Sequence, residues 1–191
     1  MTQNSNIIIS IDCMGGDNHI DDIVSGINQY YNENKMDQFL LHGNKKEIEP
    51  ILRNFYELKK NCRVIHTEKS IGMEEKPAQT IRSGRKSSMW NAIESVKKSK
   101  ANVIVSCGNT GSLMAISTFL LKRLPGVKRP AIAIFWPSFS ETGFNIVLDA
   151  GADIKAQPID LVAYANFGTS ICKSVFDIKK PRIGLLNVGT E

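Results

Sequence analysis

The chain has 191 residues, of which 42% are hydrophobic and 23% are charged, proportions that exclude a low-complexity chain and fit an ordinary folded protein. Its net charge of +5 is mild and its basic residues are dispersed, so anionic substrates or acidic partners are favoured over nucleic acid. No run approaches the ~18 apolar residues of a membrane span, and the first residues lack the features of a signal peptide. We therefore expect a cytoplasmic protein and leave peripheral contact with a membrane open.

Most of the chain alternates apolar runs, typical of strands buried on both faces, with stretches of helical periodicity. In chain order we predict a strand at 6–12, a helix at 20–32, a strand at 38–43, a helix at 46–58 and a strand at 62–67. A polar loop at 68–77 then ends in a proline suited to a helix start. The stretch 78–99 is predicted as one helix broken near Gly84 or as two short helices.

The rest of the chain continues this alternation. We predict a strand at 102–106, a helix at 111–124, strands at 131–137 and 144–151, a helix at 158–176 and a final strand at 182–188. The short turn "SFSETG" makes the two adjacent strands an antiparallel pair. The whole pattern predicts the α/β class, with a mostly parallel sheet and helices on both of its faces. No repeat or Pro-, Gly- or Ser-rich linker divides the chain, so we expect no internal boundary within 1–191.

Small residues interrupt the apolar sequence where three predicted strands end, at 14–17, 108–111 and 189–191. Ligands of open α/β sheets bind at the carboxyl ends of the strands, where such loops converge. Glycines let backbone amides approach a ligand, and the helix predicted from Gly111 points free N–H groups and its positive dipole end there. A phosphate is a natural occupant, with Asn109 and Thr110 as side-chain donors.

A simple strand-to-helix turn is the alternative for the same loop, with Asn109 capping the helix. Neither GxGxxG nor GxxxxGK[ST] occurs in the sequence, so an ordinary nucleotide site is not indicated. Asp12, Asp17 and Asp149 have the chemistry of an acid, a base or a metal ligand, although capping and turn roles are the simpler interpretation. We predict no metal site and no cofactor.

The four cysteines lie far apart and form no CxxC pair, which argues against a zinc or redox motif and favours a reducing compartment. Cys13 and Cys107 fall at strand ends, where a thiolate nucleophile would need a partner such as His19, His42 or His66. A small packed residue is the alternative role for both cysteines.

Arg82, Arg85 and Lys86 form the one compact basic group of the sequence. A solvated helical face is one interpretation of this group. Docking of an acidic partner, or contact with a phosphate, is the other.

Five motifs follow one another along the chain: "IDCMGGD", "VSCGNTGSLMA", "LKRLPGVKRPAIA", "VLDAGADIKAQPIDLVAYANFG" and "PRIGLLNVGTE". In this order they resemble the phosphate acyltransferases of the PlsX type, which open bacterial phospholipid synthesis, and the resemblance spans nearly the whole chain. It implies a three-layer α/β/α sandwich akin to phosphate acetyltransferase and isocitrate dehydrogenase. It also implies an acyltransferase that converts acyl carrier protein thioesters and inorganic phosphate into acyl phosphates, and a homodimer for the full-length form.

The resemblance also implies which residues form the site. The implied catalytic residues are Asn109, Thr110, Asn187 and Thr190, and the implied substrate-binding residues are Gly15, Gly16, Asp17, Gly108, Gly111 and Gly189. The motifs further include Met14, Asp149, Gly151, Ala152 and Glu191. For docking of the acidic acyl carrier protein we select Arg82, Arg85 and Lys86 on their charge alone.

The chain departs from the family pattern in two ways. Cys13 and Cys107 stand where the family commonly has alanine, so the implied chemistry does not depend on these thiols. Family members also continue well beyond the NVGTE motif, so we expect the chain to correspond to the N-terminal part of such an enzyme. The alternatives are a non-catalytic remnant that binds phosphate or carrier protein, and a phosphotransacetylase-like enzyme that uses coenzyme A.

Overall fold

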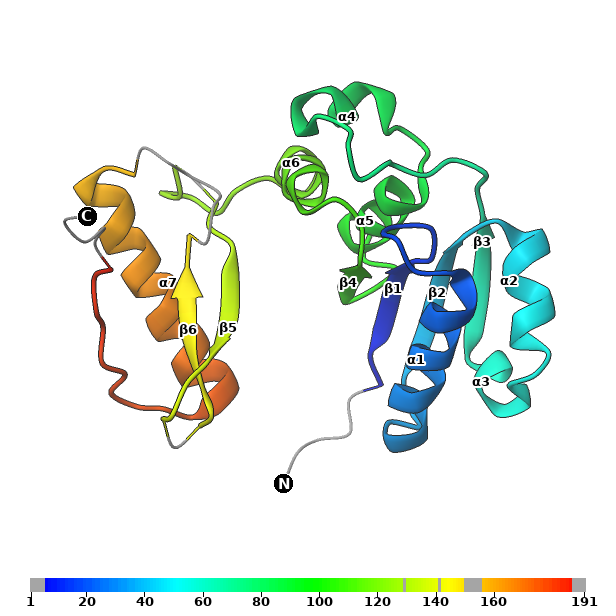
Figure 1. Ribbon diagram of the computed structural model, residues 1–191, viewed down its shortest axis with the longest axis horizontal. Coiled ribbons are helices and arrows are strands. Elements are labelled where there is room, and N and C mark those ends of the chain that lie inside the picture. The colour runs from blue at the N-terminus through cyan, green and yellow to red at the C-terminus, as the bar shows by residue number, and fades with distance from the viewer. Residues whose placement is uncertain (1–5, 129, 141, 150–155, 187–191) are drawn as a thin grey trace. The chain divides into compact units, whose positions relative to one another are not determined.

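The computed structural model describes residues 6–128, 130–140, 142–149 and 156–186. Contacts divide the chain into two compact units, residues 1–122 and residues 123–191. Each unit contains its own sheet, with four strands in the first and two in the second (Figure 1). Within the described ranges, none of the helices has the length and apolar character needed to cross a bilayer.

The first unit is built on a parallel sheet with the strand order β3-β2-β1-β4. Its elements, in chain order, are β1 (Ile8–Asp12), α1 (Ile20–Glu33), β2 (Gln38–Gly43), α2 (Lys45–Leu52), α3 (Tyr56–Lys60), β3 (Cys62–His66), α4 (Pro77–Ser83), α5 (Ser88–Lys97), β4 (Val103–Ser106) and α6 (Thr110–Leu121). Each connection between consecutive strands passes through at least one helix, as parallel strands require. The predicted α/β class and mostly parallel sheet are therefore confirmed.

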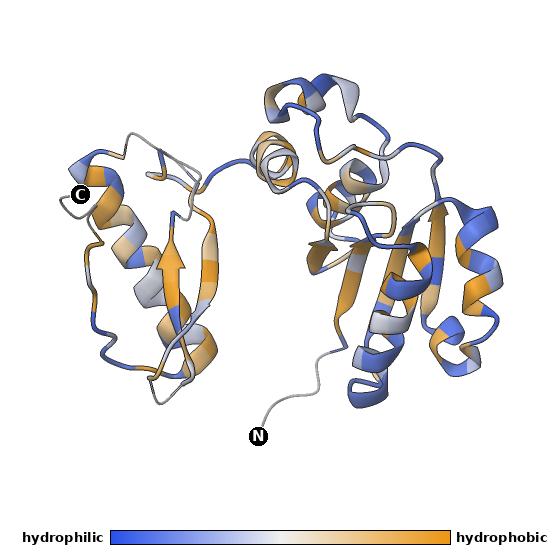
Figure 2. Ribbon diagram, in the orientation of Figure 1, coloured by the Kyte–Doolittle hydropathy of each residue, from blue (hydrophilic) through white to orange (hydrophobic). Residues whose placement is uncertain are grey.

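One face of this sheet carries an apolar core. Alternate residues along a strand point to the same face, and here they contribute Ile9 and Ile11 from β1 and Phe39 and Leu41 from β2. The opposing helices add Val24, Ile27 and Tyr31 from α1 and Ile48 and Leu52 from α2. Figure 2 shows the same distribution, with hydrophobic strands next to helices that are largely hydrophilic along their outer sides.

Helix α5 packs against β1, β2 and β4, and this contact includes a buried polar network around His42. The ring is 1% exposed, and its Nε2 lies 3.0 Å from the Ser10 hydroxyl and 3.3 Å from the Ser95 hydroxyl. Both hydroxyls donate to backbone carbonyls, of Ala92 and Asn91, so Nε2 is the nitrogen that carries the hydrogen. Burial lowers the pKa of His42 to about 4, which keeps the ring neutral.

A second apolar cluster joins α5 and α6. It contains Ile71, Met89, Trp90, Ile93, Ile116 and Leu120. Helix α6 also packs along α4, and these contacts fix the N-terminal end of α6 at the carboxyl end of β4.

The second unit consists of β5 (Ala133–Pro137), β6 (Phe144–Leu148) and α7 (Pro158–Phe176). The two strands pair antiparallel, which confirms the predicted hairpin, and α7 has the predicted bounds. Phe176 at the end of α7 packs on Phe135 and Phe144, with ring centroids 5.6 and 4.9 Å apart. A capping box between Gln157 and Asp160 starts this helix, where Pro158 is tolerated because the first N–H groups need no helical partner.

Two predicted elements differ from the structure. The predicted helix at 46–58 is two helices, α2 and α3, because a continuous helix would place Leu52 and Leu58 about 120° apart, whereas the break lets both be buried. The predicted strand at 182–188 is wrong over its described part, since 182–186 is irregular. Leu185 and Leu186 are exposed there, and the segment pairs with none of the described strands.

Candidate functional site

Two of the three predicted glycine loops leave the sheet side by side. Strands β1 and β4 are parallel neighbours, with Asp12 opposite Ser106 in register. The segments that follow them, 13–17 and 107–109, therefore start next to each other at the carboxyl edge of the sheet. The third predicted loop, at 189–191, lies outside the described residues.

Gly15, Gly16 and Gly108 allow these two loops to touch. A Cβ atom on Gly15 would lie 2.3 Å from Asp12 Oδ2 and 3.0 Å from the Gly108 nitrogen. Gly16 has a φ of +91°, and its Cβ would lie 2.5 Å from the carbonyl oxygen of Cys107. Any side chain at these positions would separate the loops.

Asp12 and Ser106 bridge the loops through hydrogen bonds. The Ser106 hydroxyl donates to Asp12 Oδ2 at 2.7 Å and accepts from the Gly108 N–H at 3.1 Å. The other carboxylate oxygen, Asp12 Oδ1, accepts from the Met14 N–H at 3.3 Å. The Gly108 amide is therefore occupied and is not free to bind a ligand.

The N-terminus of α6 adjoins these loops and is ordered by Asn109. The Asn109 side chain accepts from the Ser112 N–H at 2.9 Å, so the predicted capping role is confirmed. Its Nδ2 donates to the carbonyls of Met73 at 2.6 Å and Glu75 at 3.1 Å. Both amide hydrogens are thus used, and a role of this side chain as a donor to phosphate stays a prediction.

Thr110 and Gly111 open helix α6, and their backbone N–H groups have no partner among the described residues. Such groups lack helical acceptors by geometry. Thr110 is exposed and Gly111 is partly exposed, so neither residue is buried. Gly111 packs closely on Pro77, where a Cβ would lie 2.5 Å from the proline Cγ. This end of α6 offers donors and a positive dipole end to an anion.

Replacement of Asn109 by alanine should lower the free energy of unfolding of the first unit by about 1–2 kcal/mol, because the helix cap and the link to segment 73–75 are both lost. Asn109→Asp keeps the capping acceptor but places a carboxylate against two carbonyls, so it should restore little of the loss. Urea unfolding of both variants measures this. If Asn109→Asp were as stable as wild type, the contacts with Met73 and Glu75 would be dispensable.

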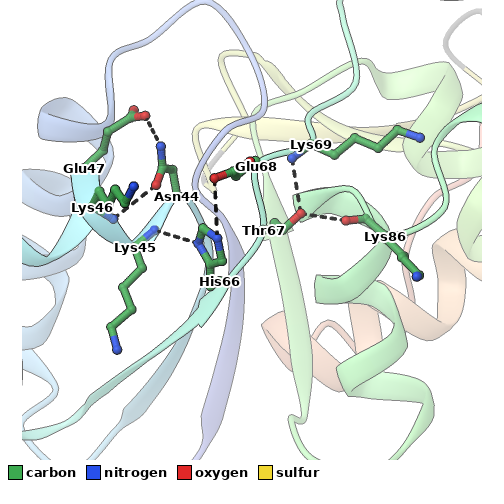
Figure 3. Close-up of polar contacts among 9 residues, drawn as sticks. All are labelled: Asn44, Lys45, Lys46, Glu47, His66, Thr67, Glu68, Lys69 and Lys86. Carbon is green, nitrogen blue, oxygen red and sulfur yellow. Dashed lines mark hydrogen bonds and ion pairs between the residues drawn. The ribbon is translucent and has the colours of Figure 1, made fainter.

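Thr67, which follows β3, organises the basic part of the same sheet edge (Figure 3). Its hydroxyl donates to the carbonyl of Lys86 at 2.7 Å and accepts from the N–H of Lys69 at 3.2 Å. Ser88 N–H donates to the Lys69 carbonyl at 2.8 Å, so the backbones of Lys69 and Lys86 are tied together. Lys86 has a φ of 65°, an uncommon conformation for a residue with a side chain.

Five exposed cations lie between residues 69 and 86, namely Lys69, Lys76, Arg82, Arg85 and Lys86. None of them forms an ion pair with a described carboxylate, whereas Lys45 and Lys98 are paired with Glu49 and Glu94. Arg85 lies 6.0 Å from the centre of the Trp90 ring. Hydrogen bonds through Thr67 hold the backbone of Lys69 next to that of Lys86, and the predicted grouping of Arg82, Arg85 and Lys86 as a docking site stays a prediction.

The amino-acid sequence matches a known protein family. The family model described as "Fatty acid synthesis protein" matches residues 7–191. The chain belongs to this family. A relative named phosphate acyltransferase from Ruegeria sp. (strain TM1040) is 48% identical over 184 residues, which is 96% of this chain and 49% of that protein. Another from Roseobacter denitrificans (strain ATCC 33942 / OCh 114) is 45% identical over 190 residues, covering 100% of this chain and 53% of that protein.

The chain thus spans about half the length of these members of the fatty acid synthesis protein family. Among solved structures, a phosphotransacetylase from Streptococcus pyogenes superposes with a TM-score of 0.65 and 17% sequence identity, covering 91% of this chain and 55% of that one. This likeness confirms the predicted phosphate acetyltransferase-like α/β fold.

The remaining predicted site residues of this family member include some outside the described ranges. Asp17 is exposed and has no partner among the described residues. Asp149 lies in the second unit, with a φ of 65°. The residues Asn187, Gly189, Thr190 and Glu191, and the motif positions Gly151 and Ala152, fall outside the described ranges. Across the part of the chain that the structure describes, no three His, Cys, Asp or Glu side chains are grouped as a metal site would require.

The cysteines have different environments. Cys13 is fully buried, and burial raises the pKa of its thiol, which agrees with a packed role. Cys107 is exposed and forms no hydrogen bond with a described histidine. His42, the histidine whose backbone carbonyl accepts from the Cys13 N–H at 3.0 Å, directs its ring to Ser10 and Ser95 instead.

Sequence reasoning missed Ser106 and Lys69. Ser106 ends the apolar run "VIVS" just before the glycine loop, and a polar residue at that position is the one signal that pointed to it. Lys69 has no local signal, because its approach to Lys86 depends on hydrogen bonds through Thr67.

Proposed function

We propose that this member of the fatty acid synthesis protein family transfers an acyl group from an acyl carrier protein thioester to inorganic phosphate. The observation that supports this best is that the backbone amides of Thr110 and Gly111, two residues that are not buried, have no partner among the described residues. The names of the relatives, phosphate acyltransferase, agree with an anion as substrate at this position. We further propose that residues 1–191 form the N-terminal part of one α/β/α domain.

Phosphate binds at the start of α6 in this proposal. The two free amides and the positive end of the helix dipole stabilise the dianion, and the Thr110 hydroxyl adds a donor. The loop with Gly15, Gly16 and Asp17 shapes the opposite wall. Gly108 does not donate to phosphate, because its amide is bonded to Ser106. Its lack of a side chain lets the two loops approach each other. The resemblance also implies roles for Asn187, Gly189 and Thr190, which lie outside the described residues.

The reaction needs positioning more than activation. A phosphate oxygen attacks the thioester carbonyl carbon, a tetrahedral oxyanion forms, and its collapse breaks the C–S bond and releases the thiolate. Bound phosphate is already a nucleophile, so holding it near the carbonyl supplies much of the rate. Amide donors at the oxyanion supply more. No covalent enzyme intermediate and no thiol of the protein is required, which agrees with the buried Cys13.

The acyl carrier protein docks on the cations Lys69, Arg82, Arg85 and Lys86 in this proposal. These four side chains have no described carboxylate partner, and an acidic protein is their natural complement. They lie on the connection into α5, which starts at the carboxyl edge of the sheet. A thioester carried by the docked partner would enter from the side of the glycine loops. A homodimer and a peripheral contact with the membrane stay predictions of the resemblance.

The test is a hydroxylamine assay for acyl phosphate with the 191-residue chain, an acyl carrier protein thioester and inorganic phosphate. We expect hydroxamate that requires both the protein and phosphate. Acyl-coenzyme A replaces the carrier thioester in a parallel reaction and should react more slowly. Absence of phosphate-dependent hydroxamate would contradict a catalytic function for this chain, and faster reaction with coenzyme A would contradict the carrier protein as donor.

The docking surface is tested in the same assay with the double variant Lys69→Glu, Lys86→Glu. It should raise the KM for the carrier thioester roughly tenfold or more and leave the reaction with acyl-coenzyme A unchanged. Lys100→Glu is the matched control, because Lys100 follows α5 at the opposite edge of the sheet. If Lys100→Glu raised this KM equally, the carrier protein would be attracted by the net positive charge of the chain and not by these four cations.

A further inference from the structure

The two loops of the proposed phosphate site are connected by a chain of three hydrogen bonds through two side chains. From one loop, the Met14 N–H donates to Asp12 Oδ1. From the other, the Gly108 N–H donates to the Ser106 hydroxyl. The Ser106 hydroxyl then donates to Asp12 Oδ2 at 2.7 Å. The route from one loop to the other is therefore continuous.

Each half of this arrangement is a common local turn, but their junction is not local. A carboxylate or hydroxyl that accepts an N–H two residues later is frequent in loops. The bond between Asp12 and Ser106 joins residues 94 positions apart in the sequence. Neither local turn requires the hydrogen bond between Asp12 and Ser106. This bond therefore has a role beyond forming the turns.

We propose that Asp12 and Ser106 are positioning residues that couple the two glycine loops, so that order in one loop depends on order in the other. The proposal relies on the proposed function only for the ligand that the loops bind. The coupling itself concerns the chain without ligand.

The environment makes this coupling strong. Asp12 is 2% exposed, and a hydrogen bond to a buried carboxylate is stronger than one between neutral groups. A serine hydroxyl has one hydrogen, and donation of that hydrogen to Asp12 leaves a lone pair directed at the Gly108 N–H. A side chain at position 15 would displace the Asp12 carboxylate, since a Cβ on Gly15 would lie 2.3 Å from Asp12 Oδ2 and 3.0 Å from the Gly108 nitrogen.

The test substitutes a residue in one loop and measures the hydrogen-exchange rate of an amide in the other loop by NMR. Ser106→Ala should accelerate exchange of the Met14 amide roughly tenfold or more, although the Met14 amide is bonded to Asp12 and not to Ser106. Asp12→Asn keeps the volume but cannot accept at both positions, and it should accelerate exchange of the Gly108 amide. Amides of β2 serve as the reference for global stability and should be unchanged.

Ser106→Thr is the conservative control, because it keeps the hydroxyl and should preserve the protection of Met14. Acceleration that is confined to the substituted residue's own loop, in both variants, would overturn the coupling. If Ser106→Ala does not fold, Asp12→Asn read at Gly108 decides the question alone.

Inorganic phosphate then separates this inference from the proposed function. In the wild-type chain, phosphate should shift the amide resonances of Thr110 and Gly111 and also those of Gly15 and Gly16. In Ser106→Ala the first pair should still shift and the second should not. Absence of any phosphate-dependent shift in the wild-type chain would overturn the proposed function, and the coupling would be decided by the exchange rates.

Discussion

Gly16→Ala should lower the free energy of unfolding of the first unit by about 3 kcal/mol or more. Two effects add. A φ of +91° is strained for any residue with a Cβ atom, and that atom would lie 2.5 Å from the carbonyl oxygen of Cys107. The obstacle is backbone, which cannot rotate away as a side chain tip can, so the loops must separate. Loss of the proposed phosphate site should accompany the loss of stability.

Urea unfolding followed by the fluorescence of Trp90 measures this effect, in a background where Trp136 of the second unit is replaced by phenylalanine. Gly26→Ala is the matched control, since Gly26 lies in α1 with nothing within 4 Å of a new Cβ. Alanine favours helix over glycine, so this control should gain about 0.5–1 kcal/mol. If the two variants were equally stable, the close contact between the loops would not exist in solution.

Acidification should destabilise the chain through His42. The folded state binds this proton only near pH 4, whereas the unfolded chain binds it near the ordinary pKa of about 6.5. The unfolded state therefore holds more protons between these values, and stability falls as the pH falls through them. From about pH 7.5 to about pH 5, the contribution of His42 to the free energy of unfolding should drop by about 2 kcal/mol.

The cause of this pH dependence is visible in the polar network. Protonation would add a hydrogen to Nδ1, which is buried without a partner among the described residues, while Nε2 already faces Ser10 and Ser95. Urea unfolding at the two pH values measures the effect in the wild-type chain and in His42→Gln, which should lose it. His19→Gln replaces an exposed histidine and should retain it. An unchanged pH dependence in His42→Gln would assign the effect to other groups.

Local patterns in the sequence predicted most of the fold. Apolar runs bounded by polar residues located β2 at 38–43, and a proline followed by a long apolar stretch located α7 at 158–176, both with their observed bounds. The helix predicted at 46–58 was wrong in its continuity, because burial of Leu58 depends on the tertiary core. The strand predicted at 182–188 was wrong over 182–186, because an apolar run becomes a strand only when it pairs with a neighbour, and this segment pairs with no described strand.

The candidate site could be predicted only in part. The meeting of two glycine loops follows from the rule that parallel strands present their carboxyl ends together. The bond between Asp12 and Ser106 depends on the register of β1 with β4, which no local pattern specifies. The two contacts of Asn109 with segment 73–75 likewise bring together parts of the chain whose proximity is set by how α4 and α6 pack.

The contact between Gly15 and Gly108 also limits how this sequence can evolve. A larger residue at position 15 would need a smaller residue at position 108, or the reverse. Both positions are already glycine, the smallest residue. A Cβ on Gly108 would lie 2.8 Å from the terminal methyl of Met89, which is the flexible end of a side chain, and 3.2 Å from the Cα of Gly15, which is backbone. The two positions therefore form a pair in which neither member can drift independently, even though 92 other residues separate them along the chain.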